Sequence, residues 1–141
     1  FLLSKEISKI MIKEKKGSII SIASIQGVVG NDKRLYAGSK FKGIQMSSPA
    51  VYSTSKSALI GLTRYLATYL GEFNIRANSI SPGGLSGAQN KRFKKNYSKK
   101  VPLNRMGTLN EVAKSVLFLS SDSSSYISGQ NILVDGGYTA W

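Results

Sequence analysis

The sequence predicts an α/β fold built around a parallel sheet. Three short segments rich in β-branched or apolar residues, 18–23, 75–81 and 130–134, are typical of buried strands, and segments long enough for helices separate them. Strands that alternate with helices favour βαβ units, in which consecutive strands run parallel. The composition agrees, because 41% of the 141 residues are apolar and 19% are charged, which is typical of one globular domain.

A helix is predicted over residues 1–15, before the first strand. Its apolar side chains recur at the spacing of one helix face, at Leu3, Ile7, Ile10 and Met11. Residues 18–23 then form the first predicted strand, and Ser24 follows at its carboxyl end. Open parallel sheets bind their ligands at that end of the strands, so Ser24 is a candidate site residue, although it could also simply end a strand.

A long connection separates the first strand from the next helix. Residues 27–48 hold several glycines and scattered charges, which predicts a loop, and a loop of this length is often functional. Ser48 is a candidate N-cap, with Pro49 in the first helical position. The predicted helix ends at Gly71 and carries an apolar stripe made of Leu59, Leu62, Leu66 and Leu70.

The second half of the chain continues the alternation of strand and helix. The strand at 75–81 is stopped by Pro82-Gly83-Gly84, and a second loop is expected over residues 85–101. Thr108, with Glu111 three residues later, forms a capping-box pattern. That pattern predicts the start of the helix that leads to the last strand.

The chain contains no cysteine and no histidine. This excludes disulfides, thiolate nucleophiles, Ser-His-Asp catalysis and almost every zinc site, so no metal is expected. Asp135-Gly136-Gly137 is accordingly interpreted as a tight turn rather than a metal site. We expect a cytoplasmic protein without a signal peptide or membrane span, since cysteine is absent and no apolar run approaches about 18 residues.

Acid-base chemistry in this chain must therefore come from tyrosine, lysine, serine or carboxylates. Tyr52 and Lys56 lie four residues apart at the start of a predicted helix, so they project from one face, one turn apart. A phenol titrates near ~10, but an ammonium ~4 Å away at an effective dielectric of ~20 favours the phenolate by about 4 kcal/mol, roughly three pKa units. Desolvation opposes this gain. Tyr52, Lys56 and Ser24 are the candidate catalytic set.

A second Tyr-x-x-x-Lys pair, Tyr36 and Lys40, shows that the pattern alone is weak. Gly38 lies within that spacer and no apolar stripe follows it, so nothing there predicts a helix. Tyr36 is nevertheless closer to Ser24 along the chain. We favour Tyr52, because about five turns of amphipathic helix follow it and provide a rigid scaffold.

Several segments, in order, resemble the later half of the short-chain dehydrogenases/reductases. They are GSIISIASIQG (17–27), YSTSKSALIGLTRYLA (52–67), NIRANSISPGG (74–84) and PLNRMGTLNEVAKSVLFLSSDSSSYISGQNILVDGG (102–137). The resemblance implies the carboxy-terminal half of a Rossmann-like doubly wound parallel sheet. It implies an oxidoreductase that transfers hydride between NAD or NADP and a small-molecule carbonyl or alcohol. It also implies a homo-oligomer, paired through the helices that contain Ile7 and Leu59.

The resemblance also implies roles for individual residues. Ser24 would orient the substrate carbonyl, and Tyr52 would act as the acid/base. Lys56 would bind the nicotinamide ribose and promote ionisation of the tyrosine. The cofactor-binding residues that it implies are Tyr52, Lys56, Pro82, Gly83 and Leu85.

The chain departs from the family pattern in three ways, one of which is that Gly84-Leu85-Ser86 lacks the threonine that often follows Pro-Gly in the family. It contains no G-x-x-x-G-x-G loop, so residues 1–141 are predicted to be a single partial domain, the catalytic half without the amino-terminal βαβ units and their pyrophosphate site. Ser24 and Tyr52 are 28 residues apart, more than is usual in the family, because 27–48 carries an insertion. The insertion and the closing GGYTAW resemble a subgroup linked to bacterial surface-sugar and flagellin modification, which implies a sugar or sugar-nucleotide substrate.

The net charge of +13 leaves other functions open. Residues 91–100 carry six cations and no acid. They form a solvated surface, a substrate-covering lid that meets an anionic group of the substrate, or a nucleic-acid surface with Phe93 and Tyr97 as stacking groups. Nucleic acid is the least favoured partner. A non-catalytic fragment and a basic anion-binding module are the alternatives to an oxidoreductase.

Overall fold

The computed structural model describes residues 1–141, except for the side chain of Phe41. Its main sheet has three parallel strands in the order β1-β4-β5, namely β1 (Gly17–Ile22), β4 (Ile75–Pro82) and β5 (Asn131–Val134). The predicted α/β fold with a parallel sheet is confirmed. Each strand boundary lies within one residue of its expected position.

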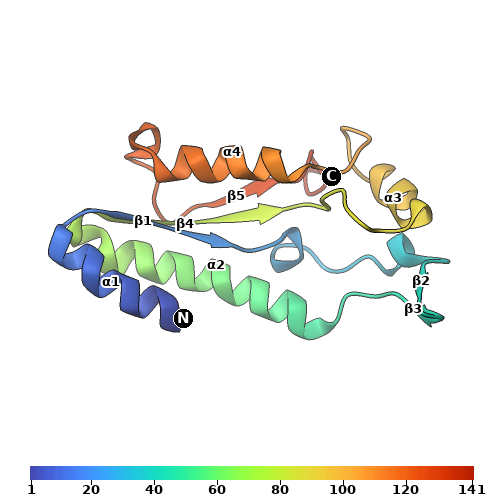
Figure 1. The fold of residues 1–141 in the computed structure, drawn as a ribbon, viewed down its shortest axis with the longest axis horizontal. Helices are drawn as coiled ribbons and strands as arrows, with labels where there is room; N and C mark the ends of the chain where they lie inside the picture. Colours follow the sequence, from blue (N-terminus) through green and yellow to red (C-terminus); the bar gives the residue numbers. More distant parts are fainter.

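Helices cover both faces of this sheet (Figure 1). The helices α1 (Leu2–Glu14) and α2 (Ala50–Leu70) lie on one face, and α4 (Leu109–Ser120) lies on the other. The helix α2 connects β1 to β4, and α4 connects β4 to β5, so the sheet is doubly wound. All three strands point their carboxyl ends toward the same edge, where a site is expected.

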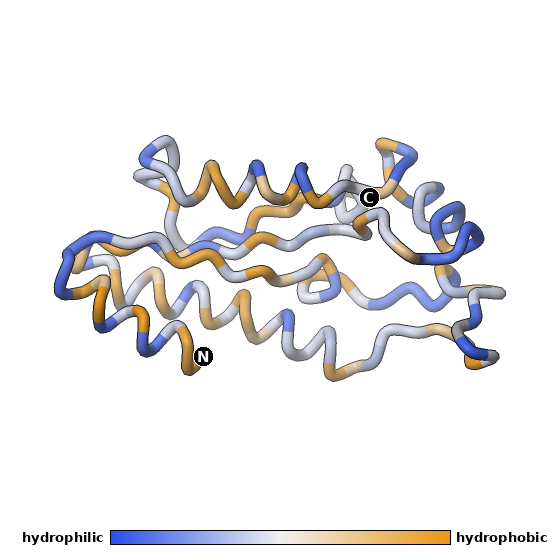
Figure 2. Tube along the Cα trace, in the orientation of Figure 1, coloured by the Kyte–Doolittle hydropathy of each residue, from blue (hydrophilic) through white to orange (hydrophobic). Residues whose placement is uncertain are grey.

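The core lies between the sheet and each helical layer. Figure 2 shows apolar stretches along the strands and alternating polar and apolar positions along α1. On the α2 side, Leu66 and Leu70 pack against Ile75 and Ala77 of β4, and Leu70 is fully buried. The core on the α4 side consists of Ile80, Val112 and Leu119.

The central strand β4 also buries polar side chains, and each has a partner. The Asn78 side chain is fully buried; its Nδ2 donates to the carbonyl of Ile127 (2.8 Å) and its Oδ1 accepts from the amide of Gln130 (3.0 Å). The hydroxyls of Ser79 and Ser81 both donate to Asn131 Oδ1 (3.0 and 2.8 Å). These bonds fix β5 beside β4, because a buried polar group without a partner would be costly.

The predicted N-cap of α2 is wrong by one residue, whereas the predicted end at Gly71 is confirmed. Pro49 is the N-cap, and Ser48 does not cap, because its hydroxyl donates to the Gln26 side chain instead. At the other end, Gly71 keeps right-handed helical geometry and begins the 3-10 helix η3 (Gly71–Phe73). The left-handed residue is Asn74 (φ 58°), which is the residue type other than glycine that accepts this conformation most readily.

Both predicted loops contain secondary structure. The segment 27–48 follows the 3-10 helix η1 (Ile25–Gly27) and holds η2 (Lys33–Tyr36) and a hairpin of β2 (Lys40–Phe41) and β3 (Ile44–Gln45). The second loop contains α3 (Lys91–Ser98), which begins where Asn90 Oδ1 accepts from the amide of Phe93 (2.8 Å). A further 3-10 helix, η4 (Asp122–Ser124), follows α4.

The capping box is confirmed. Thr108 Oγ1 accepts from the amide of Glu111 (3.3 Å), and Glu111 Oε2 accepts from the amide of Thr108 (2.8 Å). Arg105 pairs with the same carboxylate, and this guanidinium, followed by the bonds from Thr108, lowers the pKa of Glu111 to about 2. The tight turn after β5 is also confirmed, because Asp135 accepts from the amides of Gly137 and Thr139 (both 2.9 Å).

Candidate active site

The candidate site lies where the carboxyl ends of β1 and β4 meet the first turn of α2. A cavity of about 200 Å³ opens there, and Ser24, Tyr52 and Gly83 all line it. These residues are distant in the sequence and come from three different elements. The sheet edge at which parallel strands end brings them together, as the sequence predicted for Ser24.

Ser24 is held rigidly just beyond β1. The amide of Ala23 still donates to the carbonyl of Ile80 (2.7 Å), which extends the sheet by one residue. Ser24 is buried, and its Oγ accepts from the amide of Gln26 (3.2 Å), so the serine caps η1. Among the described groups, no acceptor is bonded to the hydrogen of this hydroxyl. The hydroxyl is therefore able to donate to a molecule in the cavity.

The turn after Ser24 packs directly on α2. A Cβ placed on Gly27 would lie 2.8 Å from the backbone carbon of Lys56, so only glycine permits this approach. The Ser57 hydroxyl donates to the carbonyl of Gly27 (3.0 Å) and fastens the contact. This packing sets the position of Ser24 relative to the first turns of α2.

Tyr52 and Lys56 lie together on α2. The Lys56 Nζ donates to the carbonyl of Ile22 at the end of β1 (2.8 Å) and lies 5.7 Å from the centre of the Tyr52 ring. The ammonium is thus held at the sheet edge, and two of its three donors remain for a ligand. Tyr52 is 39% exposed, as suits a side chain that must reach a bound molecule.

The alternative pair, Tyr36 and Lys40, does not share a helix. Tyr36 ends η2, and Lys40 lies in β2. The Tyr36 ring packs on Phe93, with the ring centres 5.2 Å apart, although it also lines the cavity. The structure therefore gives Tyr36 a neighbouring aromatic ring, whereas it gives Tyr52 a neighbouring ammonium.

The proposed cofactor residues after β4 divide between two cavities. The amide of Gly83 donates to the carbonyl of Val134 (2.9 Å), which keeps the turn against β5. Gly83 and Gly84 line both the cavity with Ser24 and a second one of about 500 Å³. Leu85 lines only the second cavity, and it pairs there with Gly107.

The donor set fits one half of a nicotinamide dinucleotide. The Lys56 ammonium with the Tyr52 hydroxyl suits the hydroxyls of a ribose, and Gly83, which carries no side chain, allows a flat ring to approach the backbone. The sequence contains no glycine-rich phosphate loop, so these residues account for the nicotinamide end alone. Among the residues whose side chains are described, no three or more His, Cys, Asp or Glu side chains gather where they could hold a metal ion.

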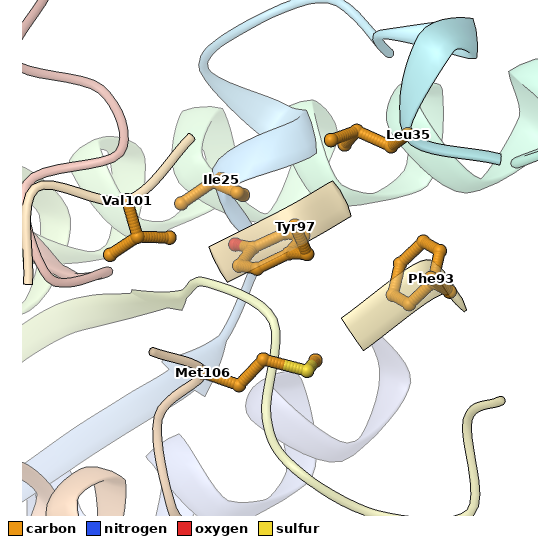
Figure 3. Packing of buried hydrophobic residues seen from close by; sticks show 6 residues of the cluster. All are labelled: Ile25, Leu35, Phe93, Tyr97, Val101 and Met106. Carbon is orange, nitrogen blue, oxygen red and sulfur yellow. The ribbon is translucent and has the colours of Figure 1, made fainter. Parts of the chain in front are cut away.

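Aromatic residues of α3 complete the cavity, which the sequence did not predict. Phe93 and Tyr97 are both buried in a cluster with Ile25, Leu35, Val101 and Met106 (Figure 3). Burial raises the pKa of Tyr97 to about 12, and its Oη accepts from the amide of Gly84. Because both rings are buried, they are not available to stack on nucleic acid. Their spacing of four residues was the sequence signal for this helix face.

A doubly wound parallel sheet with a cavity at the carboxyl ends of its strands is typical of dinucleotide-binding enzymes. The chain belongs to the short-chain dehydrogenase/reductase family, and it matches the carboxy-terminal portion of that family. Residues 41–139 match the family described as Enoyl-(Acyl carrier protein) reductase. No described helix is long and apolar enough to cross a membrane.

Individual relatives are oxidoreductases. The chain is 37% identical to the 3-oxoacyl-[acyl-carrier-protein] reductase FabG of Buchnera aphidicola, covering 97% of this chain and 52% of that protein. It is also 37% identical to xanthoxin dehydrogenase of Arabidopsis thaliana, covering 99% of this chain and 49% of that protein. The chain spans about half the length of the curated relatives it matches.

A solved structure has the same fold over nearly the whole chain. A short chain dehydrogenase from Leptospira borgpetersenii with bound NAD+ superposes with a TM-score of 0.89 at 41% identity. The match covers 99% of this chain and 51% of that one. The Rossmann-like interpretation of the partial sheet is therefore confirmed.

Proposed function

We propose that this chain supplies the catalytic half of an NAD(P)-dependent oxidoreductase that transfers hydride between the cofactor and a carbonyl or alcohol carbon. The observation that carries the proposal is that Ser24 and Tyr52 line one cavity, with the Lys56 ammonium 5.7 Å from the Tyr52 ring. The oxidoreductase relatives and the related dehydrogenase with bound NAD+ support it.

Each residue has a definite task in the proposed reaction. A nicotinamide held beside Tyr52 and Lys56 would supply or accept the hydride at the substrate carbon. In the reductive direction, the Tyr52 hydroxyl gives its proton to the substrate oxygen while Ser24 donates a hydrogen bond to the same oxygen. Lys56 stabilises the phenolate that remains, because its ammonium is bonded to the Ile22 carbonyl and lies beside the Tyr52 ring. Oxidation of the alcohol runs through the same steps in reverse.

The lining of the cavity supports a hydroxylated substrate, such as a sugar derivative. The side-chain amides of Gln26, Asn31 and Gln89 line the cavity together with the half-buried ring of Tyr36. Amides bond hydroxyl groups, and ring faces cover the apolar side of a sugar. The nearby cations of α3 would also favour a substrate with a phosphate or carboxylate.

Replacing Ser24 with alanine tests this function. In the full-length protein, we expect Ser24→Ala to lower kcat/KM by about 10²-fold or more, because one hydrogen bond to the developing oxyanion is lost. NADH and NADPH oxidation would be followed by absorbance with a panel of aldehydes, ketones and keto sugars, with and without phosphate. Ser120→Ala is the matched control, since that exposed hydroxyl only bonds the carbonyl of Leu117 (2.8 Å). Equal rates for Ser24→Ala and wild type would contradict the assignment.

We also propose that the protein pairs with a second copy through α1 and α2. Ile10, Tyr65 and Tyr69 are each 58% exposed on these helices, and the two tyrosine rings stack with centres 5.7 Å apart. An exposed apolar patch of this kind is typical of an interface. The double variant Tyr65→Glu/Tyr69→Glu is expected to reduce the mass in light scattering to that of a monomer. Tyr126→Glu, at a fully exposed tyrosine, is the control; an unchanged mass in the double variant would place the contact elsewhere.

A further inference from the structure

The segment 27–48 contacts α3 and the residues beside it along their whole length. Ahead of the helix, the Ser39 hydroxyl donates to Asn90 Oδ1 (3.3 Å). In its last turn, Asn96 Nδ2 donates to the carbonyl of Leu35 (3.2 Å). Beyond its end, Lys100 forms an ion pair with Asp32. Three polar contacts at three levels thus attach the helix to this segment.

Apolar packing reinforces the same attachment. Leu35 is buried in the cluster with Phe93 and Tyr97, which Figure 3 shows converging from η2 and α3. Gly38 has a left-handed backbone (φ 69°), and a Cβ there would lie 2.7 Å from the Arg92 guanidinium. Gly38 therefore lies directly against the Arg92 side chain, and its left-handed backbone favours glycine at this position.

On its other side, α3 is attached to the turn after β4. The Tyr97 hydroxyl accepts from the amide of Gly84, and its ring stacks on Tyr138 with the centres 5.2 Å apart. Leu35, Tyr97 and Gly84 all line the cavity that contains Ser24 and Tyr52. The basic helix consequently forms part of the wall of the site.

We infer that the segment 27–48 is a clamp that holds α3 closed over the site, with Asp32 as its positioning residue. This inference rests on the proposed function and adds a role for the insertion that separates Ser24 from Tyr52. The clamp keeps the cavity wall in place before substrate arrives, which lowers the cost of ordering it on binding. Asp32 acts through α3 and does not take part in the chemical step.

The surroundings of Asp32 suit a permanent contact. Its side chain is 13% exposed and lies between two cations, Arg34 (2.9 Å) and Lys100. Arg34 first and Lys100 second hold the pKa of the Asp32 carboxyl well below its usual range. A depressed carboxyl pKa means that the pair is lost only in strong acid, so the clamp persists at neutral pH. Asp32 Oδ1 also caps η2 through the amide of Arg34 (3.0 Å).

Trypsin provides a direct test, because residues 91–100 contain six lysine or arginine sites. In the folded full-length protein, Asp32→Asn is expected to speed cleavage within 91–100 by about three- to tenfold, since cleavage follows the population of the opened helix. Asparagine can still cap η2, so the change removes mainly the ion pair. Glu6→Gln is the matched control. It also removes one negative charge and one ion pair, but that pair is the exposed one with Lys9 on α1 (2.6 Å). Fragments would be identified by mass spectrometry.

Steady-state kinetics separate the role of Asp32 in the clamp from the catalytic role proposed for Ser24. Asp32→Asn is expected to raise KM by about three- to tenfold with kcat within about twofold of wild type, whereas Asp32→Glu restores both values. Unchanged trypsin cleavage in Asp32→Asn would overturn the clamp whatever the activity of the protein. Faster cleavage, together with full activity of Ser24→Ala, would keep the clamp and reject the proposed catalytic role. If Asp32→Asn does not fold, as judged by circular dichroism, Asn96→Ala takes its place. This variant removes the bond from Asn96 to the Leu35 carbonyl, and the same result is expected.

Discussion

Removing a single oxygen from Tyr52 is expected to abolish most of the activity. In the full-length protein, Tyr52→Phe should lower kcat by about 10²- to 10⁴-fold, the usual contribution of a positioned acid or base. The Lys56 ammonium stays bound to Ile22, and the ring stays over the cavity, so the variant loses only the proton that the reaction needs. Steady-state rates with either dinucleotide would measure the effect.

Tyr36→Phe is the matched control for this experiment. Tyr36 also lines the cavity, but its neighbour is the ring of Phe93 and not an ammonium. We expect kcat to stay within about threefold of wild type in this variant, because no proton transfer depends on it. Loss of turnover in Tyr36→Phe with a fully active Tyr52→Phe would reverse the assignment of the two tyrosines.

The largest loss of stability is expected at the centre of the sheet. Ile80 in β4 is fully buried and packs with Val112 and Leu119 of α4. Ile80→Ala should lower the free energy of unfolding by about 2–5 kcal/mol, which combines lost apolar burial with the cavity that remains. Urea unfolding with an unchanged slope would measure this difference as a shift in midpoint.

Ile44→Ala, the same substitution at an exposed position, is the control. Ile44 in the hairpin strand β3 is 74% exposed, so Ile44→Ala should change the free energy of unfolding by less than about 0.5 kcal/mol. Two equal shifts in midpoint would mean that β4 is not the centre of a packed core. They would also remove the physical basis for the position of Ser24, since that residue is held by the end of the sheet.

The features predicted correctly from the sequence are those whose residues lie close together along the chain. The pattern of Thr108 and Glu111 fixes its own helix start, because the two residues bond each other within one turn. Tyr52 and Lys56 are adjacent on α2 for the same reason, since residues four apart always share a helix face. No helix was predicted at α3, because only Phe93 and Tyr97 mark its apolar face and four of its eight residues are cations.

The sequence by itself determined the parallel α/β order, the Tyr-Lys pair and the family. These features depend on residue spacings within single helices and strands, so they do not depend on how the elements pack together. Only the tertiary structure decided that Ser24 and Tyr52, 28 residues apart, line one cavity, that Leu85 lines a different one, and that the segment 27–48 contacts the end of α3. Contacts of this kind depend on where separate elements pack, which is set by the whole core and not by any one segment.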